Sequence, residues 1–292
     1  MGHQFLNGCI RLLSGKETLI SLLEAKLATE FEKKLFEAAI NNLLDAYNPL
    51  RFNNFAYATR ELVRHILFRL APDAEVLACG WYCNETETEG GISRRQRIVF
   101  AIQGGLTDNY VADTLQIDTV AIVKEIIGVV DNLSKHTHIE EVTIDIDIEK
   151  QDEYVTDTLE SVSKLFEVVE KSRQTISESL IDHIDREVMR AAISETIIEI
   201  DELATHHSIE EVLVEEVQVE SIDSTDINFM VYGTISAQLQ YGSDADVDRG
   251  NGEIVLSPGF PFSCRLKSSV DPPDLFHNEY TDFQVNTDDF YK

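Results

Sequence analysis

Basic side chains are scarce in this sequence. Its 292 residues include 24 Lys and Arg against 53 Asp and Glu, which gives a formal net charge of −29. Such a balance disfavours nucleic-acid binding through overall charge and leaves only local basic clusters as candidates. Residues 1–136 hold 14 basic and 17 acidic residues, whereas residues 137–292 hold 10 and 36. Half of the basic groups in the first part lie between Arg51 and Arg97. We therefore expect contacts with an anionic ligand in the first part and a solvated acidic surface in the second.

Long apolar runs and cysteines are also few. No stretch of 18 apolar residues exists, so no transmembrane helix is expected. The first residues lack the basic start and apolar run of a secretory signal, so we expect a cytoplasmic protein. Four scattered cysteines in a chain of this length indicate reduced thiols and not a disulfide scaffold. A zinc site built from Cys79 and Cys83 would lack the second ligand pair that such sites need.

Hydrophobic periodicity predicts an α+β fold in two parts. Apolar residues recur at three-four spacing through residues 4–47, 53–71, 94–103 and 119–135, which indicates an N-terminal helical bundle over residues 1–138. Residues 139–292 are expected to form an acidic α+β domain. In that domain we predict a strand, a helical segment at about 151–202, an antiparallel sheet at about 209–270 and a tail.

Two ten-residue segments, 133–142 and 203–212, resemble each other and are each followed by alternating apolar and acidic residues. Each is predicted to end a helix, pass through a His-rich turn and enter a strand. In the first copy the strand would place Asp145, Asp147 and Glu149 on one face, where three carboxylates could bind Mg²⁺ in a nuclease. An edge strand with a wet acidic face explains the same alternation.

Residues 48–72 are the stretch around which the chain is expected to be organised. Pro49 stops the preceding helix, Asn53 or Asn54 can cap the next one, and Pro72 ends it. At 100° per residue, one face of this helix is apolar and is predicted to lie in the core: Phe55, Thr59, Leu62, Val63, Ile66 and Leu70. The other face carries two arginines, a carboxylate, an imidazole and an aromatic ring: Arg60, Glu61, Arg64, His65 and Phe68.

A second basic cluster opens the helix that Ser93 is expected to cap. Arg94, Arg95 and Arg97 lie in its first turn, where cations oppose the helix dipole. A solvated helix start is one interpretation of this cluster. The other is a phosphate track shared with the first cluster. We accordingly name four candidate substrate-binding residues: Arg64, Asn54, Arg94 and Arg97.

Arg60 and His65, separated by four residues, resemble the Arg-(four to six residues)-His signature of the HEPN superfamily. These are small helical bundles, and many are metal-independent ribonucleases of bacterial defence and toxin systems. Members often carry Asn, Asp or His after the Arg, whereas this chain has Glu61. Across most of the chain there is also a looser resemblance to a bacterial family named predicted pPIWI-associating nucleases. It is carried by residues 48–70, 93–106, 135–138, 238–244 and 260–262. This resemblance implies a part in defence against phage or plasmids.

The HEPN resemblance implies a specific chemistry. His65, as a neutral imidazole, would take the proton of an RNA 2′-OH, and Arg60 would hold the scissile phosphate. Glu61 would orient His65, and Arg64 would be a secondary phosphate contact. No metal or cofactor is then required, and a 2′,3′-cyclic phosphate product is expected. HEPN motifs usually meet in pairs, so the resemblance implies a homodimer with Arg60 and His65 of both chains in one cleft.

Two other functions stay open at this point. A catalytically silent HEPN-like module could serve as the binding or regulatory partner of another protein in a defence system, which suits Glu61 and the acidic second part. A metal-dependent nuclease could instead use the acidic residues of the β domain. In the third interpretation Arg60, Glu61 and His65 are surface residues that form weak pairs.

Overall fold

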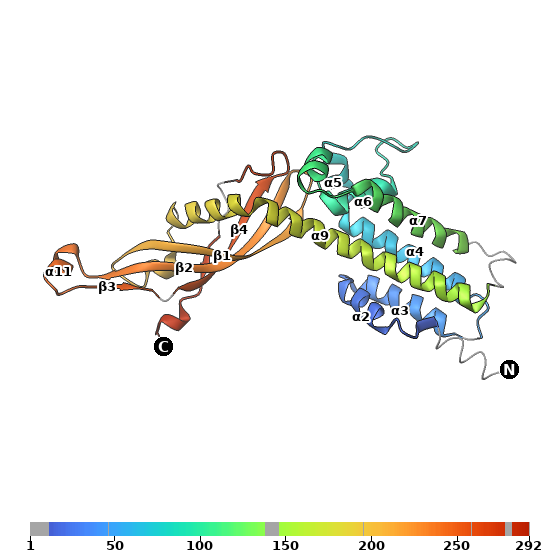
Figure 1. The fold of residues 1–292 in the computed structure, drawn as a ribbon, viewed down its shortest axis with the longest axis horizontal. Coiled ribbons are helices and arrows are strands. Elements are labelled where there is room, and N and C mark those ends of the chain that lie inside the picture. Colours follow the sequence, from blue (N-terminus) through green and yellow to red (C-terminus); the bar gives the residue numbers. More distant parts are fainter. Residues whose placement is uncertain are drawn as a thin grey trace. The chain divides into compact units, whose positions relative to one another are not determined.

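The computed structural model describes residues 12–45, 47–137, 146–194, 196–257, 259–277 and 282–291. They form two compact units. The helical unit comprises residues 1–104 and 116–171, and the sheet unit comprises residues 105–115 and 172–292. The predicted α+β class is confirmed, with a helix bundle followed by an antiparallel sheet (Figure 1). Within the described ranges, no helix combines the length and the hydropathy needed to span a membrane.

The helical unit is built around α4 (Arg51–Leu70). The other helices are α2 (Glu17–Lys26), α3 (Glu30–Leu44), α5 (Asp73–Ala78), α6 (Arg94–Gln103), α7 (Thr119–Thr137) and residues 148–171 of α9 (Ile148–Ser194). α4 packs against α3 and α7, and α9 adds apolar residues such as Val155 and Leu159 to the same core (Figure 1). Phe55 and Ile66 of α4 are fully buried, as the periodicity predicts.

The start of α4 differs from the expectation that Asn53 or Asn54 caps it. The helix begins at Arg51, and both asparagines lie inside its first turn. The reason is that the side-chain oxygen of Asn48 accepts a hydrogen bond from the backbone N–H of Leu50, at 2.9 Å. This Asx turn starts the chain reversal earlier than the position of Asn53 suggests.

The expected strand after residue 141 is wrong in the part that the structure describes. Residues 138–145, which include Asp145, lie outside the described ranges. Ile148 opens α9, a single helix of 47 residues that replaces the end of the expected strand and contains most of the predicted helical segment. The Asp147 carboxylate accepts a hydrogen bond from the backbone N–H of Lys150, at 2.9 Å, which is an N-cap contact. Capping therefore overrides the alternating pattern, and Glu149 lies in the first helical turn.

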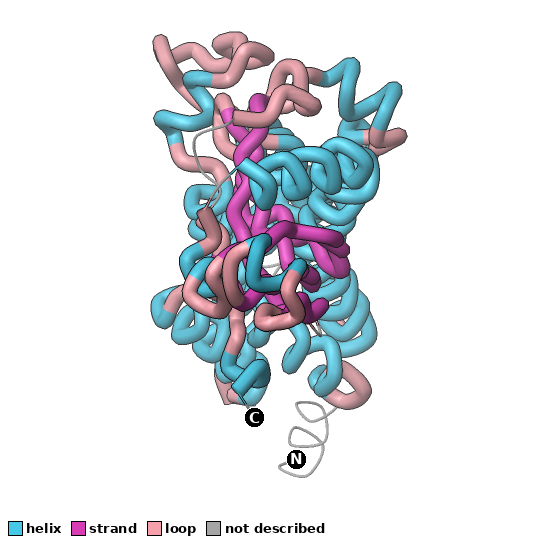
Figure 2. Tube along the Cα trace, turned by 90° about the vertical axis from the view of Figure 1, so that its left-hand side faces the viewer, coloured by secondary structure: helices cyan, strands magenta, loops and turns pink. Residues whose placement is uncertain are grey.

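The sheet unit holds all of the described strands, drawn in magenta in Figure 2. They are β1 (His206–Ile222), β2 (Asp226–Tyr241), β3 (Glu253–Leu256), β4 (Phe260–Ser269) and β5 (Gln284–Val285). The order is β1-β2-β4-β5, with β3 also paired to β2, and every pairing is antiparallel. β2 is the central strand, and its alternate residues, such as Phe229 and Val231, are fully buried. The period-two prediction is thus confirmed with longer strands than expected.

Residues 105–115 belong to the sheet unit because they contact the turn between β1 and β2. The Gly105 N–H donates to the carbonyl oxygen of Asp223 at 2.9 Å. A Cβ at Gly105 would lie 2.4 Å from the carbonyl oxygen of Ser224, so the approach requires glycine. The following π-helix, Tyr110–Thr114, contacts α9 through a 3.0 Å hydrogen bond between the hydroxyls of Tyr110 and Ser179. Residues 105–115 therefore belong to the sheet unit, although the residues on both sides of them in the sequence belong to the helical unit.

Candidate functional site

A cavity of about 370 Å³ in the helical unit brings most of the predicted cations together. Its charged lining consists of four arginines and one glutamate: Arg60, Glu61, Arg64, Arg94 and Arg97. In a chain with a net charge of −29, the charged lining of this cavity is mainly positive. Guanidinium groups match the oxygen geometry of phosphates and carboxylates, so the lining suits an anionic ligand.

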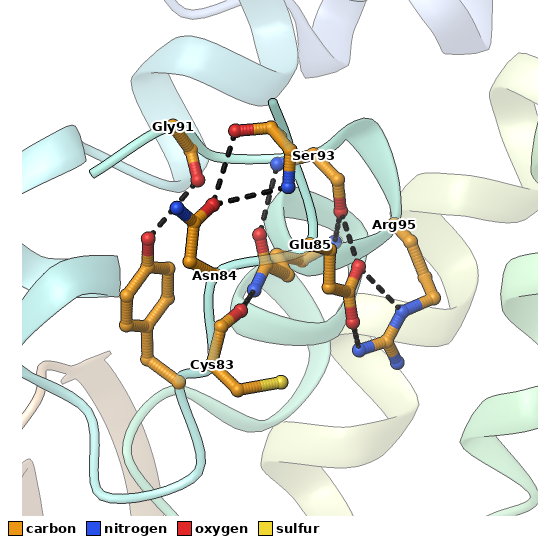
Figure 3. Close-up of polar contacts among 9 residues, drawn as sticks. Cys83, Asn84, Glu85, Gly91, Ser93 and Arg95 are labelled. Atoms are coloured by element: carbon orange, nitrogen blue, oxygen red, sulfur yellow. Dashed lines mark hydrogen bonds and ion pairs between the residues drawn. The ribbon is translucent and has the colours of Figure 1, made fainter. Parts of the chain in front are cut away.

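The start of α6 places two of these arginines. The Ser93 hydroxyl accepts from the Gln96 backbone N–H and the Gln96 side chain accepts from the Ser93 N–H, so a capping box fixes the helix. The preceding loop is connected to this cap (Figure 3): the Glu85 carboxylate accepts a hydrogen bond from the Ser93 hydroxyl and pairs with Arg95. Arg95 is thereby held away from the cavity, whereas Arg94 and Arg97 line it. The sequence alone could not separate these neighbours.

Glu61 occupies the centre of the cationic cluster. Its carboxylate accepts hydrogen bonds from Arg60 at 3.0 Å and from Arg64 at 2.9 Å. Burial would raise the pKa of Glu61, but the hydrogen bonds and charges of Arg64 and Arg60 outweigh it, so the pKa lies below its ordinary value. Glu61 is therefore ionised at neutral pH. A carboxylate of this protein sits where the oxygens of a bound anion would sit.

Arg94 and Arg97 differ in how firmly they are held. Arg94 is exposed and pairs with Asp131 at 2.9 Å. Arg97 is 7% exposed. It donates to the Ala71 carbonyl at 2.7 Å and to Asp73 at 2.6 Å. The Arg97 guanidinium also lies 3.7 Å from the centre of the Phe68 ring. Arg97 thus connects the end of α4 to the start of α5. Although it lines the cavity, its hydrogen bonds hold the fold together.

His65 does not line the cavity. Its ring packs edge-on against Phe31 of α3, with centroids 4.7 Å apart, and its Nε2 lies 3.2 Å from the Arg64 guanidinium. The five-residue separation rotates it about 140° from Arg60 on the helix. Arg60 instead bonds to the Thr137 hydroxyl at 3.2 Å. Both Glu61 oxygens accept hydrogen bonds from arginines, and the orientation of His65 by Glu61 stays a prediction.

The remaining candidates lie apart from the cavity. Asn54 is half-buried near the start of α4 and does not line it. Sequence reasoning did not assign five other lining residues to a site: Val63, Leu67, Ile92, Val130 and Ser134. Val130 and Ser134 come from α7, whose pairing with α4 has no local signal in the sequence. Among the described residues, no three or more His, Cys, Asp or Glu side chains are grouped so as to hold a metal ion.

Two family models match the chain. The first covers residues 24–162 and the second covers residues 169–291, and both carry the description "predicted pPIWI-associating nuclease". The two matches meet inside α9, close to the boundary between the helical and sheet units. No curated protein and no solved structure matches the chain.

Proposed function

The chain belongs to the family of predicted pPIWI-associating nucleases, and from that premise we propose that it is a metal-independent endoribonuclease of the HEPN type. One observation carries the proposal: Arg60, Arg64 and Arg94 converge on one cavity of an otherwise strongly acidic protein. Such a cavity suits the phosphates of a nucleic acid, which are the groups that any nuclease must grip.

The proposed chemistry uses the 2′-OH that RNA carries. His65 takes its proton as a general base, and the freed oxygen attacks the adjacent phosphorus. Arg60 and Arg64 stabilise the negative charge that develops on the phosphate oxygens. The bond to the 5′-oxygen of the next nucleotide breaks, and this oxygen takes up a proton from an imidazolium of the site, which leaves a 2′,3′-cyclic phosphate on one fragment and a free 5′-OH on the other. These steps require proton transfer and charge stabilisation from the chain's own residues.

A homodimer completes the proposed site. Within one protomer, the cavity holds arginines, whereas His65 lies outside its lining against Phe31. Phe31 is itself 55% exposed, so an apolar ring borders the imidazole on the protein surface. We infer that a second protomer, related by a twofold axis, places its own His65 at the mouth of the cavity and so forms a composite site.

Cleavage assays with single-stranded RNA in the presence of EDTA test the proposal. His65→Ala is expected to lower the rate about 10²–10⁴-fold, as expected for loss of a general base. Arg60→Ala is expected to lower it about 10²–10³-fold, as expected for loss of a charge-stabilising group. The matched control is Arg95→Ala, because Arg95 neighbours Arg94 but pairs with Glu85 outside the cavity lining. This control should keep wild-type activity.

Glu61 favours one alternative function. Because its carboxylate already bridges Arg60 and Arg64, the module could be catalytically silent and act as the binding or regulatory partner in a defence system. RNA binding without cleavage in the same assay would support that alternative. Cleavage of DNA that EDTA abolishes would instead point to metal-dependent chemistry and would contradict the proposal.

A further inference from the structure

The cavity of the helical unit has an apolar side that phosphate binding does not need. Four aliphatic residues and one aromatic ring line it: Val63, Leu67, Ile92, Val130 and Phe68. Phe68 is 43% exposed although it is a large apolar side chain. An exposed ring beside two guanidinium groups and aliphatic walls is the kind of surface on which nucleobases stack.

Phe68 is also held in place. The Arg97 guanidinium lies 3.7 Å from the centre of its ring, and Arg97 is fixed by the Ala71 carbonyl and by Asp73. Because the ring's orientation is set by a buried neighbour, a ligand that stacks on it need not order the ring first. Arg64 is placed more loosely, 5.5 Å from the same ring, and its side chain is 51% exposed.

The size of the cavity limits what it can hold. Its volume of about 370 Å³ lies at the small end of the range for ligand pockets, about 300–1,000 Å³. One nucleotide fits this scale, with the base against the apolar wall and the phosphate among the arginines. A base that is paired within a duplex cannot reach the wall unless it leaves the stack, which costs free energy.

We propose that this cavity binds a single unpaired ribonucleotide, with its base against Phe68 and its phosphate at Arg60, Arg64 and Arg94. The inference rests on the proposed function, and it deepens it by naming the substrate class as single-stranded RNA. Base contact through an aromatic ring is tolerant of sequence, because every base has a π-face. The cavity therefore selects unpaired structure and not a particular base.

Calorimetric titration of the full chain with three probes tests the inference. The probes are inorganic phosphate, ribose 5-phosphate and adenosine 5′-monophosphate. We expect the nucleotide to bind about tenfold or more tightly than ribose 5-phosphate, because only the nucleotide offers a base to stack. Phe68→Leu, which keeps an apolar side chain without an aromatic face, should abolish this difference. Phe68→Tyr should restore it.

Tyr57→Leu is the matched control for the aromatic ring. Tyr57 is on the same helix, is 55% exposed and lies 5.3 Å from the Arg60 guanidinium, but it does not line the cavity. It should leave the tenfold preference unchanged. Circular dichroism and thermal melting check that each variant is folded, and Phe68→Tyr keeps the test informative if Phe68→Leu is destabilised.

The possible outcomes separate the two proposals. Equal affinity for the nucleotide and ribose 5-phosphate overturns the base contact and leaves the arginine site standing. Failure of all three probes to bind overturns both. A nucleotide preference that Phe68 controls, in a protein that cleaves no RNA, supports the base contact and contradicts the ribonuclease proposal.

Discussion

The two units each contain a cavity of similar size, and the two cavities differ in their charged lining. The cavity of the helical unit measures about 370 Å³ and is lined by four arginines and one glutamate. The cavity of the sheet unit measures about 420 Å³ and is lined by residues of α9 and β1, including Asp185, Arg186 and Arg190. Its two arginines pair with neighbours on their own helix, Arg190 with Glu187 and Arg186 with His183. In the helical unit Arg60 and Arg64 also pair within their helix, but Arg94 and Arg97 pair with Asp131 and Asp73 of other elements. Four arginines from two helices line the first cavity and two arginines from one helix line the second, a difference that net charge alone does not reveal.

Reversing charge in each cavity should give the largest difference in RNA affinity between variants of the two units. Arg60→Glu with Arg94→Glu is expected to weaken single-stranded RNA binding at least about 100-fold, since each lost charge-assisted contact costs about 1.5–3 kcal/mol. Arg186→Glu with Arg190→Glu makes the same charge change in the sheet unit and should change the affinity less than about threefold. Fluorescence anisotropy with labelled RNA measures both. Equal losses in the two double variants would show that only overall charge matters.

How much of the fold and of the arginine-lined cavity could be predicted depends on which contacts are local in the sequence. The core face of α4, the Ser93 cap and the sheet strands could be predicted, because periodicity and capping are local properties of the sequence. The cavity itself could not, because Val130 and Ser134 reach it through the packing of α7 on α4. The three arginines at the start of α6 also differ in their ion-pair partners, which lie elsewhere in the chain. These partners are Asp131 for Arg94, Glu85 for Arg95 and Asp73 for Arg97. The alternating residues before Ile148 misled the prediction because Asp147 caps α9.

Stability measurements should distinguish a buried arginine from an exposed one. Arg97→Ala is expected to lower the free energy of unfolding by about 2–3 kcal/mol, because it leaves the hydrogen bonds at Ala71 and Asp73 unmade. Arg190→Ala, in the sheet unit, removes an exposed pair with Glu187 and should cost less than about 0.5 kcal/mol. Urea titration followed by circular dichroism compares them. A loss as small for Arg97 as for Arg190 would contradict the structural role of Arg97.

Removing the Glu61 carboxylate from the arginine cluster should increase RNA affinity, whereas the charge reversals should decrease it. Glu61→Gln is expected to raise RNA affinity up to about fivefold, because the ligand's phosphate no longer competes with a carboxylate whose partly exposed ion pairs are worth about 1 kcal/mol or less. Glu187→Gln removes the carboxylate charge beside Arg190 in the sheet unit and should leave RNA affinity unchanged. Anisotropy at low salt detects a change of this size. Weaker binding by Glu61→Gln would mean that the carboxylate supports the site.

The smallest expected effect concerns the stability of the folded protein at acidic pH. Burial would raise the pKa of Glu32, but the Arg69 hydrogen bond and two backbone N–H groups outweigh it and lower the pKa. The unfolded chain then binds this proton more tightly than the folded one, so the stabilisation is present at neutral pH. It is lost as pH falls from the ordinary Glu value through the lower folded value.

Glu32→Gln should therefore flatten the pH dependence of thermal melting below the ordinary Glu value. Asp226 of the sheet unit, whose pKa is likewise lowered through Lys267, provides the counterpart in Asp226→Asn. Melting temperatures measured at closely spaced pH values report both. If Glu32→Gln leaves the slope of melting temperature against pH unchanged, Glu32 does not contribute to the loss of stability in acid.

The most direct test of the account is complementation between two inactive variants, Arg60→Ala and His65→Ala, mixed in equal amounts and allowed to exchange subunits. If one protomer's arginine cavity works with the His65 of its partner, half of the dimers are mixed and each carries one intact site. RNA cleavage by the mixture should then recover to about a quarter of the wild-type rate, as twofold symmetry requires. A mixture that stays as inactive as its components would contradict a composite site.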